Sequence, residues 1–181
     1  MWLISFDIDG TMEFGDPPGI LNEEVVNYFR DRGAMVGSAS DRPVSSQRSM
    51  WKQYGFELDF AILKHHMKTL RTEYPEFTCY WLVGDRPLDQ QNAKEAEFTV
   101  IWVDEFPTIE QAEEFFTSLE KIAAMNDADK IEYINNLNYR LIKTKELDEN
   151  QKKSGDIYLP IKELEQSIIC LLYTSPSQRD A

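Results

Sequence analysis

Short apolar runs alternate with segments of helical character along the first hundred residues. The apolar runs are bounded by Gly, Pro or acidic residues and have the length of strands; they are residues 2–6, 34–40, 58–64, 79–85 and 98–103. The segments between them predict helices at about residues 22–32, 43–54, 66–74 and 88–97. Strands that alternate with helices favour a parallel sheet covered on both faces. We therefore predict an α/β fold with a doubly wound, Rossmann-like sheet of about five strands.

The first predicted helix carries a start signal, an apolar side and a stop signal. Asn22 is of a residue type that caps helix N-termini, and Gly33 is of the type that follows the last turn. The apolar positions between them should face the sheet; they are Val25, Val26 and Phe29. In the second helix, Pro43 suits the first turn.

Beyond about Asp104 the alternation gives way to helical spacing alone. Thr108 and Gln111 have the spacing of a capping box. The residues that follow them share an apolar helix face, namely Ala112, Phe115, Phe116, Leu119 and Ile122. A second, weaker helix is predicted at about residues 127–143. We predict a catalytic domain over residues 1–106, helices that pack on or beside it over 107–145, and a charged linker and tail over 146–181.

The last residues carry a pattern of a different kind. Residues 170–181, CLLYTSPSQRDA, resemble the translated read-through of a sequencing adapter, commonly seen as CLLYTSPSPRD, and depart from it within that stretch only at Gln178. The alternative is a native apolar helix end with a polar tail. We assign no function to these residues, and a continuous genomic reading frame through Ala181 would exclude the adapter.

Composition and charge narrow the classes of function. Hydrophobic residues make up 42% of the chain, enough to build a core. The net charge of -13 disfavours nonspecific binding to nucleic acid or to anionic membranes. No basic segment precedes an apolar run at the amino end, and no run has membrane-spanning length, so we expect a cytoplasmic protein. Cys79 and Cys170 lack the spacing of a zinc site, and Cys79 is expected in the core of a strand.

The candidate chemistry begins where the first strand ends, in WLISFDIDGTM. Asp7 and Asp9 at a buried strand end would repel each other and lose hydration, so we expect a cation between them, most simply a divalent metal. Other reactive groups follow the later strands; they are Ser40 after the second, Lys64 after the third, and Asp85 with Asp89 after the fourth. Because ligands bind at the carboxyl ends of parallel strands, these residues predict one site.

In this order the residues resemble the motifs of the haloacid dehalogenase superfamily. FDIDGT matches the DxDGT motif, SDRP supplies a serine, a lysine follows the third strand, and GDRPLD matches GDxxxD. The resemblance covers about residues 1–104 and does not extend over the helical remainder. It implies a Mg²⁺-dependent phosphatase that acts through an aspartyl phosphate.

The resemblance also implies the role of each acid. Asp7 would be the nucleophile, and Asp9 would be general acid and then general base. Asp7, the backbone carbonyl of Asp9, and Asp85 would hold the Mg²⁺ ion. Asp89 would orient those ligands from behind.

Ser40 and Lys64 would complete the phosphate site, although each has a neighbour that could replace it. Ser38 is the alternative to Ser40, which stands two residues before Arg42, as the family pattern prefers. Lys68 is the alternative to Lys64, which we favour because it ends the predicted strand.

Other conspicuous residues have simpler interpretations. The adjacent His65 and His66 would point apart on a helix, so a structural role is expected rather than a metal site. Arg42 and Arg86 would either contact the substrate or form surface ion pairs. We expect Trp51, Trp81 and Trp102 to be packing residues.

The space between the motifs bears on the substrate. The gaps where members of the superfamily carry cap domains hold only a loop over 12–21, and a helix and a strand over 43–63. A capless site resembles those of members that act on larger phosphorylated molecules or rely on oligomer partners. We expect a phosphorylated small molecule or macromolecule as substrate, with nucleic acid disfavoured by the acidity of the chain.

Two other classes of protein share features of this sequence. A noncatalytic phosphate-sensing or partner-binding module with the same fold is the alternative to the enzyme. A two-component receiver domain would need an aspartate after the third strand, and LDFAILK has none there.

Overall fold

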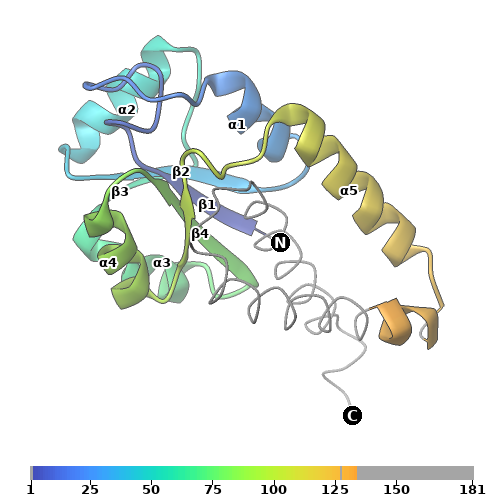
Figure 1. The fold of residues 1–181 in the computed structure, drawn as a ribbon. Coiled ribbons are helices and arrows are strands. Elements are labelled where there is room, and N and C mark those ends of the chain that lie inside the picture. Colours follow the sequence, from blue (N-terminus) through green and yellow to red (C-terminus); the bar gives the residue numbers. More distant parts are fainter. Residues whose placement is uncertain (1, 127, 134–181) are drawn as a thin grey trace, which may run out of the picture. The chain divides into compact units, whose positions relative to one another are not determined.

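The computed structural model describes residues 2–126 and 128–133, and it confirms the α/β prediction. The chain divides after Phe106 into two units, which are described separately. In the first unit, five strands form one sheet in which every pairing is parallel, with the order β3-β2-β1-β4-β5 (Figure 1). The strands are β1 (Trp2–Phe6), β2 (Met35–Ser40), β3 (Phe60–Leu63), β4 (Cys79–Gly84) and β5 (Thr99–Trp102).

Helices cover both faces of this sheet. α1 and α2 lie on one face and α3 and α4 on the other (Figure 1), which is the doubly wound arrangement. Their bounds are α1 (Glu23–Arg30), α2 (Val44–Gln53), α3 (Lys68–Glu73) and α4 (Pro87–Ala96). A short 3₁₀ turn, η1 (Lys64–His66), separates β3 from α3, so the third helix begins later than the sequence pattern predicts.

Apolar packing fixes the sheet between the two helix layers. One cluster joins sheet residues to α3 and α4; it contains Leu3, Ala39, Phe60, Met67, Leu70, Tyr80, Leu82, Ala93, Ala96 and Phe98. A second group of rings includes Phe6 with Trp51, at a centroid distance of 6.1 Å, and Phe29 with Trp81, at 6.5 Å. Trp51 and Trp81 are buried, as predicted, and so is Cys79. Because the strands are held from both sides, the groups at their carboxyl ends have a rigid base.

The first helix follows the predicted signals. The side chain of Asn22 accepts a hydrogen bond from the Val25 amide at 3.2 Å. Val25, Val26 and Phe29 are buried. Gly33 has a φ of +88°, which explains a glycine just beyond the helix.

The loop after β1 is compact and carries no inserted domain. Residues 12–21 form a short excursion that a bridge between Met12 and Leu21 closes. Between Pro43 and Leu63 the chain contains only α2 and β3 with their connections. Within the described residues, the strand ends therefore carry no cap at either of these positions.

The second unit begins with α5 (Ile109–Ala123), which the predicted capping box starts. The Thr108 hydroxyl accepts from the Gln111 amide at 3.3 Å, and the Gln111 side chain accepts from the Thr108 amide at 3.0 Å. Residues 128–133 are helical. The rest of the predicted helix at 127–143, the linker and the tail lie outside the described residues. None of the helices in the described part of the chain has both the length and the apolar character to span a membrane.

Candidate active site

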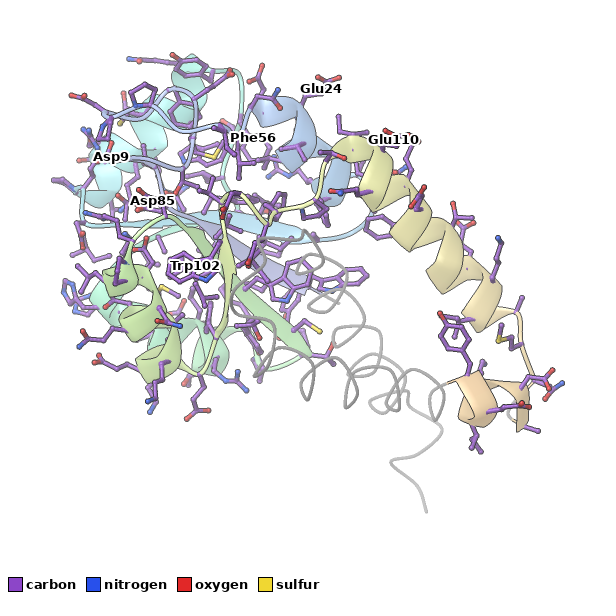
Figure 2. All side chains as sticks on the ribbon, in the orientation of Figure 1. Asp9, Glu24, Phe56, Asp85, Trp102 and Glu110 are labelled. Carbon is purple, nitrogen blue, oxygen red and sulfur yellow. The ribbon has the colours of Figure 1, made fainter. Side chains whose placement is uncertain are left out.

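The parallel register brings the predicted site residues to one edge of the sheet. β1 lies between β2 and β4, and Phe6 is paired with Ser38 on one side and with Val83 on the other. The next residue, Asp7, donates its amide to the Val83 carbonyl at 2.9 Å. Figure 2 shows Asp9 and Asp85 on the same side of the molecule, where β1 and β4 end.

A lysine between two aspartates forms the buried centre of this edge. The Lys64 Nζ donates to Asp7 Oδ2 at 2.6 Å and also to Asp89 Oδ1. All three side chains are 0% exposed. Lys68 is 70% exposed and lies 3.9 Å from a Glu97 carboxylate oxygen instead. The geometry therefore places Lys64, rather than Lys68, among the acids.

The environment of Asp7 favours a cation close to its carboxylate. Asp7 Oδ1 accepts from the Ile8 amide at 2.8 Å, and Asp7 Oδ2 lies 3.4 Å from an Arg86 nitrogen. Burial raises the pKa of Asp7; the charge and hydrogen bond of Lys64 oppose this rise, and the charge of Asp89 adds to it. A further cation at this carboxylate would favour the ionised form.

Asp89 is occupied by donors from the protein itself. Its Oδ2 accepts from the amides of Asp85 and Arg86 at 3.1 and 3.0 Å, and its Oδ1 accepts from Lys64. It stands at the third position of α4, where a carboxylate can reach back to the amide of the N-cap residue, here Arg86. Asp89 therefore fixes Lys64 and the loop that carries Asp85.

The acids fit a divalent cation. One carboxylate oxygen each of Asp7, Asp85 and Asp89 lies within 4.8 Å of the others. Both oxygens of Asp7 and both oxygens of Asp89 accept hydrogen bonds, whereas the Asp85 carboxylate has a 3.9 Å contact with Arg86. Asp85 therefore has the most room for direct coordination, and Asp7 would share an oxygen between the cation and one of its present donors. The site joins five carboxylates, of residues 7, 9, 41, 85 and 89, to three cations, of residues 42, 64 and 86. Acids therefore outnumber cations at this edge, which favours a divalent cation such as Mg²⁺, an ion that prefers oxygen ligands.

Gly10 gives Asp85 its position. A Cβ built on Gly10 would lie 2.1 Å from Asp85 Oδ2, and Gly10 has a φ of +74°. Any larger residue would therefore displace the Asp85 carboxylate as well as straining the backbone. Asp85 can therefore lie close to Asp7 only because residue 10 is a glycine.

We expect Gly10→Ala to weaken Mg²⁺ binding at least about tenfold, because the methyl group expels Asp85. Gly33→Ala is the matched control, since Gly33 shares the positive φ and a Cβ built on it would meet no described heavy atom within 4 Å. It should cost only about 1 kcal/mol of stability from backbone strain. Calorimetric Mg²⁺ titration and urea unfolding measure the two effects. Equal Mg²⁺ affinity in both variants would show that Asp85 is not a ligand.

Asp9 lies beside the buried centre and pairs with Arg42. Asp9 Oδ1 accepts from Arg42 Nη2 at 2.8 Å, Asp9 Oδ2 accepts from Arg42 Nε at 2.8 Å, and the Asp16 amide donates to Oδ1 at 2.8 Å. Burial would raise the pKa of Asp9, but the hydrogen bonds from Arg42 and Asp16 and the charges of Arg42 and Arg86 together lower it. This arrangement holds the Asp9 side chain as a carboxylate.

The lowered pKa of Asp9 predicts a pH-dependent contribution to stability. The folded chain binds this proton less tightly than the unfolded chain, so the Asp9–Arg42 pair stabilises the fold above the ordinary pKa of 3.8 and is lost as the pH falls below it. We expect Arg42→Gln to lower the urea midpoint at pH 7 in metal-free buffer. The difference from the wild type should shrink as the pH approaches and passes 3.8. A difference that is constant with pH would contradict this assignment.

The structure distinguishes the positions of the two candidate serines. Ser40 is the last residue of β2, paired with Leu63 and buried, and its hydroxyl accepts from the Arg42 amide at 3.4 Å. Ser38 lies two positions earlier in β2, and its buried hydroxyl has no hydrogen-bond partner among the described residues. Ser40 is therefore the serine at the edge where the acids meet.

One residue that holds this edge together has no signal in the sequence. Gln47 is fully buried on α2, and its Nε2 donates to the carbonyls of Ser40, Arg42 and Ile62 at 3.3, 2.7 and 3.1 Å. It thus ties the loop after β2 to β3. A glutamine in a polar helix normally faces solvent, so only the tertiary contacts identify it.

The two histidines do not join the acids. The His65 and His66 rings lie 4.1 Å apart, centroid to centroid, in the turn after β3. Neither belongs to a cluster of metal-ligating side chains within the described residues. The prediction that the two rings point apart is wrong, because these residues lie in the 3₁₀ turn η1 and not on an α-helix, and their rings are in contact.

No family model, no curated protein and no solved structure matches this chain. The motifs and the geometry of the site are therefore what indicate its chemistry.

Proposed function

We propose that this protein is a Mg²⁺-dependent phosphatase of the haloacid dehalogenase type, which hydrolyses a phosphomonoester through an aspartyl phosphate on Asp7. The observation that supports it most is the meeting of Asp7, Lys64 and Asp85 from the ends of three strands. Phosphoryl transfer to a carboxylate requires a nucleophilic acid, a cationic group that stabilises charge on the phosphoryl oxygens, and a further acid that binds the metal ion.

In this proposal the reaction has two steps, formation and hydrolysis of the aspartyl phosphate, and each side chain has a role in them. An oxygen of the Asp7 carboxylate forms a bond to phosphorus, the bond to the leaving oxygen breaks, and Asp9 protonates that oxygen. Asp9 then takes a proton from water as the water attacks phosphorus, which releases inorganic phosphate and restores Asp7. Lys64 orients Asp7 and stabilises negative charge on the phosphoryl oxygens, with Ser40 as a hydroxyl donor. Mg²⁺ held by Asp7 and Asp85 would reduce the repulsion between the carboxylate and the phosphate.

Arg42 adds a condition to the first step. While Arg42 holds Asp9 through both oxygens, Asp9 remains deprotonated and cannot serve as an acid. Productive binding of substrate therefore requires Arg42 to move away from Asp9, at least in part.

Phosphate release from 4-nitrophenyl phosphate tests the proposal. The purified protein should release 4-nitrophenol with Mg²⁺, lose this activity in EDTA, and regain it when Mg²⁺ is restored. Turnover that EDTA does not reduce would overturn the proposal. Acid quenching during turnover should trap phosphate on the peptide that contains Asp7, and its recovery on another peptide would exclude Asp7 as the nucleophile.

A noncatalytic phosphate-binding module is the second candidate. The pairing of Asp9 with Arg42 favours it, because this pairing removes the acid from use. Such a module would bind inorganic phosphate with Mg²⁺ and turn over no member of a phosphoester panel.

A further inference from the structure

We infer that Arg42 and Arg86 form a subsite for a second anionic group, so that the substrate is a phosphomonoester whose leaving group carries a carboxylate or another phosphate. The inference rests on the proposed function and names its substrate class. It follows from the depth, the placement and the pairing of the two arginines.

The cations of the site lie at two depths. Lys64 is fully buried against Asp7, where the transferred phosphate would bind. The side chains of Arg42 and Arg86 are 31% and 45% exposed. Since the leaving group of a substrate on Asp7 must extend toward solvent, the arginines lie on its side of the site.

The two arginines also flank the catalytic strand. They follow β2 and β4, the two neighbours of β1, which carries Asp7 and Asp9. Arg86 Nη2 lies 3.3 Å from Asp41 Oδ2, on the residue next to Arg42. Arg42 contacts Asp9, the residue that would protonate the leaving oxygen. Both guanidinium groups therefore belong to one surface around the leaving group.

The two arginines differ in how firmly the protein already pairs them. Arg86 is spread over Asp41, Asp7 and Asp85 at 3.3, 3.4 and 3.9 Å, without a short two-point contact. It would lose two of these partners if Asp7 and Asp85 bound a cation. Arg42 contacts both carboxylate oxygens of Asp9 at 2.8 Å in a partly exposed position, so a second anion would have to compete with this two-point contact.

The chemistry of guanidinium suits this task. Its planar donors bind carboxylates and phosphates through two hydrogen bonds, whereas the ammonium of a buried lysine acts as a point charge. A second anionic group on the substrate is therefore the ligand that these two guanidinium groups suit.

Calorimetric binding of phosphonates to the full chain with Mg²⁺ tests the subsite without requiring turnover. The probes are methylphosphonate, with one anionic group, and 3-phosphonopropionate and propane-1,3-diphosphonate, which add a carboxylate or a second phosphonate. We expect the two longer probes to bind about tenfold more tightly or better, and the stronger of them identifies the second group. Arg42→Gln and Arg86→Gln should each bring the affinity of the longer probes, taken as a ratio to that of methylphosphonate in the same variant, most of the way toward one.

Arg30→Gln is the matched control for these variants. Arg30 pairs with Asp59 at 2.8 Å and is 29% exposed, much as Arg42 pairs with Asp9, but it lies at the amino ends of the strands. Equal affinity of the wild type for all three probes, or an advantage that both variants retain, would overturn the inference and leave the proposed function intact. Failure of every probe to bind would overturn both. Arg86→Lys, which keeps the charge, should fall between Arg86→Gln and the wild type.

Discussion

Lys64→Met is expected to lower the free energy of unfolding by about 3–5 kcal/mol, because it leaves two buried carboxylates without their shared cation. Lys64 Nζ contacts both Asp7 and Asp89, and none of the three side chains is exposed to solvent. Methionine preserves the apolar stem, so the loss measures the charge rather than a cavity. Urea unfolding in metal-free buffer, followed by the fluorescence of the buried Trp51 and Trp81, measures the change.

Lys68→Met is the matched control. Lys68 is largely exposed, and its nitrogen lies 3.9 Å from a Glu97 oxygen, so its removal should change stability by less than about 0.5 kcal/mol. The same comparison in the phosphatase assay should find activity lost in Lys64→Met and kept in Lys68→Met. Comparable effects of the two substitutions would mean that Lys64 does not bridge the acids in solution.

Asp7→Asn is expected to reduce phosphate release at least about 1,000-fold, because an amide cannot form the aspartyl phosphate. The amide preserves the size of the side chain and can still accept a hydrogen bond from the Ile8 amide. Asp31→Asn is a suitable control, since Asp31 is an exposed residue at the end of α1 and should leave turnover unchanged. Full activity in Asp7→Asn would exclude Asp7 as the nucleophile.

Asp7→Asn should keep or raise the stability of the fold, whereas Lys64→Met should lower it. Burial raises the pKa of Asp7, so the folded chain binds this proton more tightly than the unfolded chain does. Stability from this group is present below the ordinary pKa and is lost as the pH rises through the raised value. At neutral pH the amide removes that cost, while Lys64 keeps its contact with Asp89. Asp7→Asn should therefore unfold at the same urea concentration as the wild type, or at a higher one, in metal-free buffer.

The strands and the helix signals were predictable because they are local. Trp2–Phe6 is a strand in the prediction and in the structure, and the caps at Asn22 and Thr108 form the predicted hydrogen bonds. Boundaries were less predictable where a side chain must reach the site. The chain turns at Lys64 into η1, three residues long, before α3 begins, and this turn carries the amine inward to Asp7.

The sequence alone determined the α/β class and the order of acid, hydroxyl, amine and acid along the chain, because periodicity and motif spacing are properties of neighbouring residues. Only the tertiary structure decided which atoms meet. It shows that Lys64, and not Lys68, contacts Asp7, and that Arg42 pairs with Asp9. Lys64 and Asp7 are 57 positions apart, and their contact depends on the strand order and on packing on both faces of the sheet. Such contacts arise from the whole fold, so no local pattern could identify them.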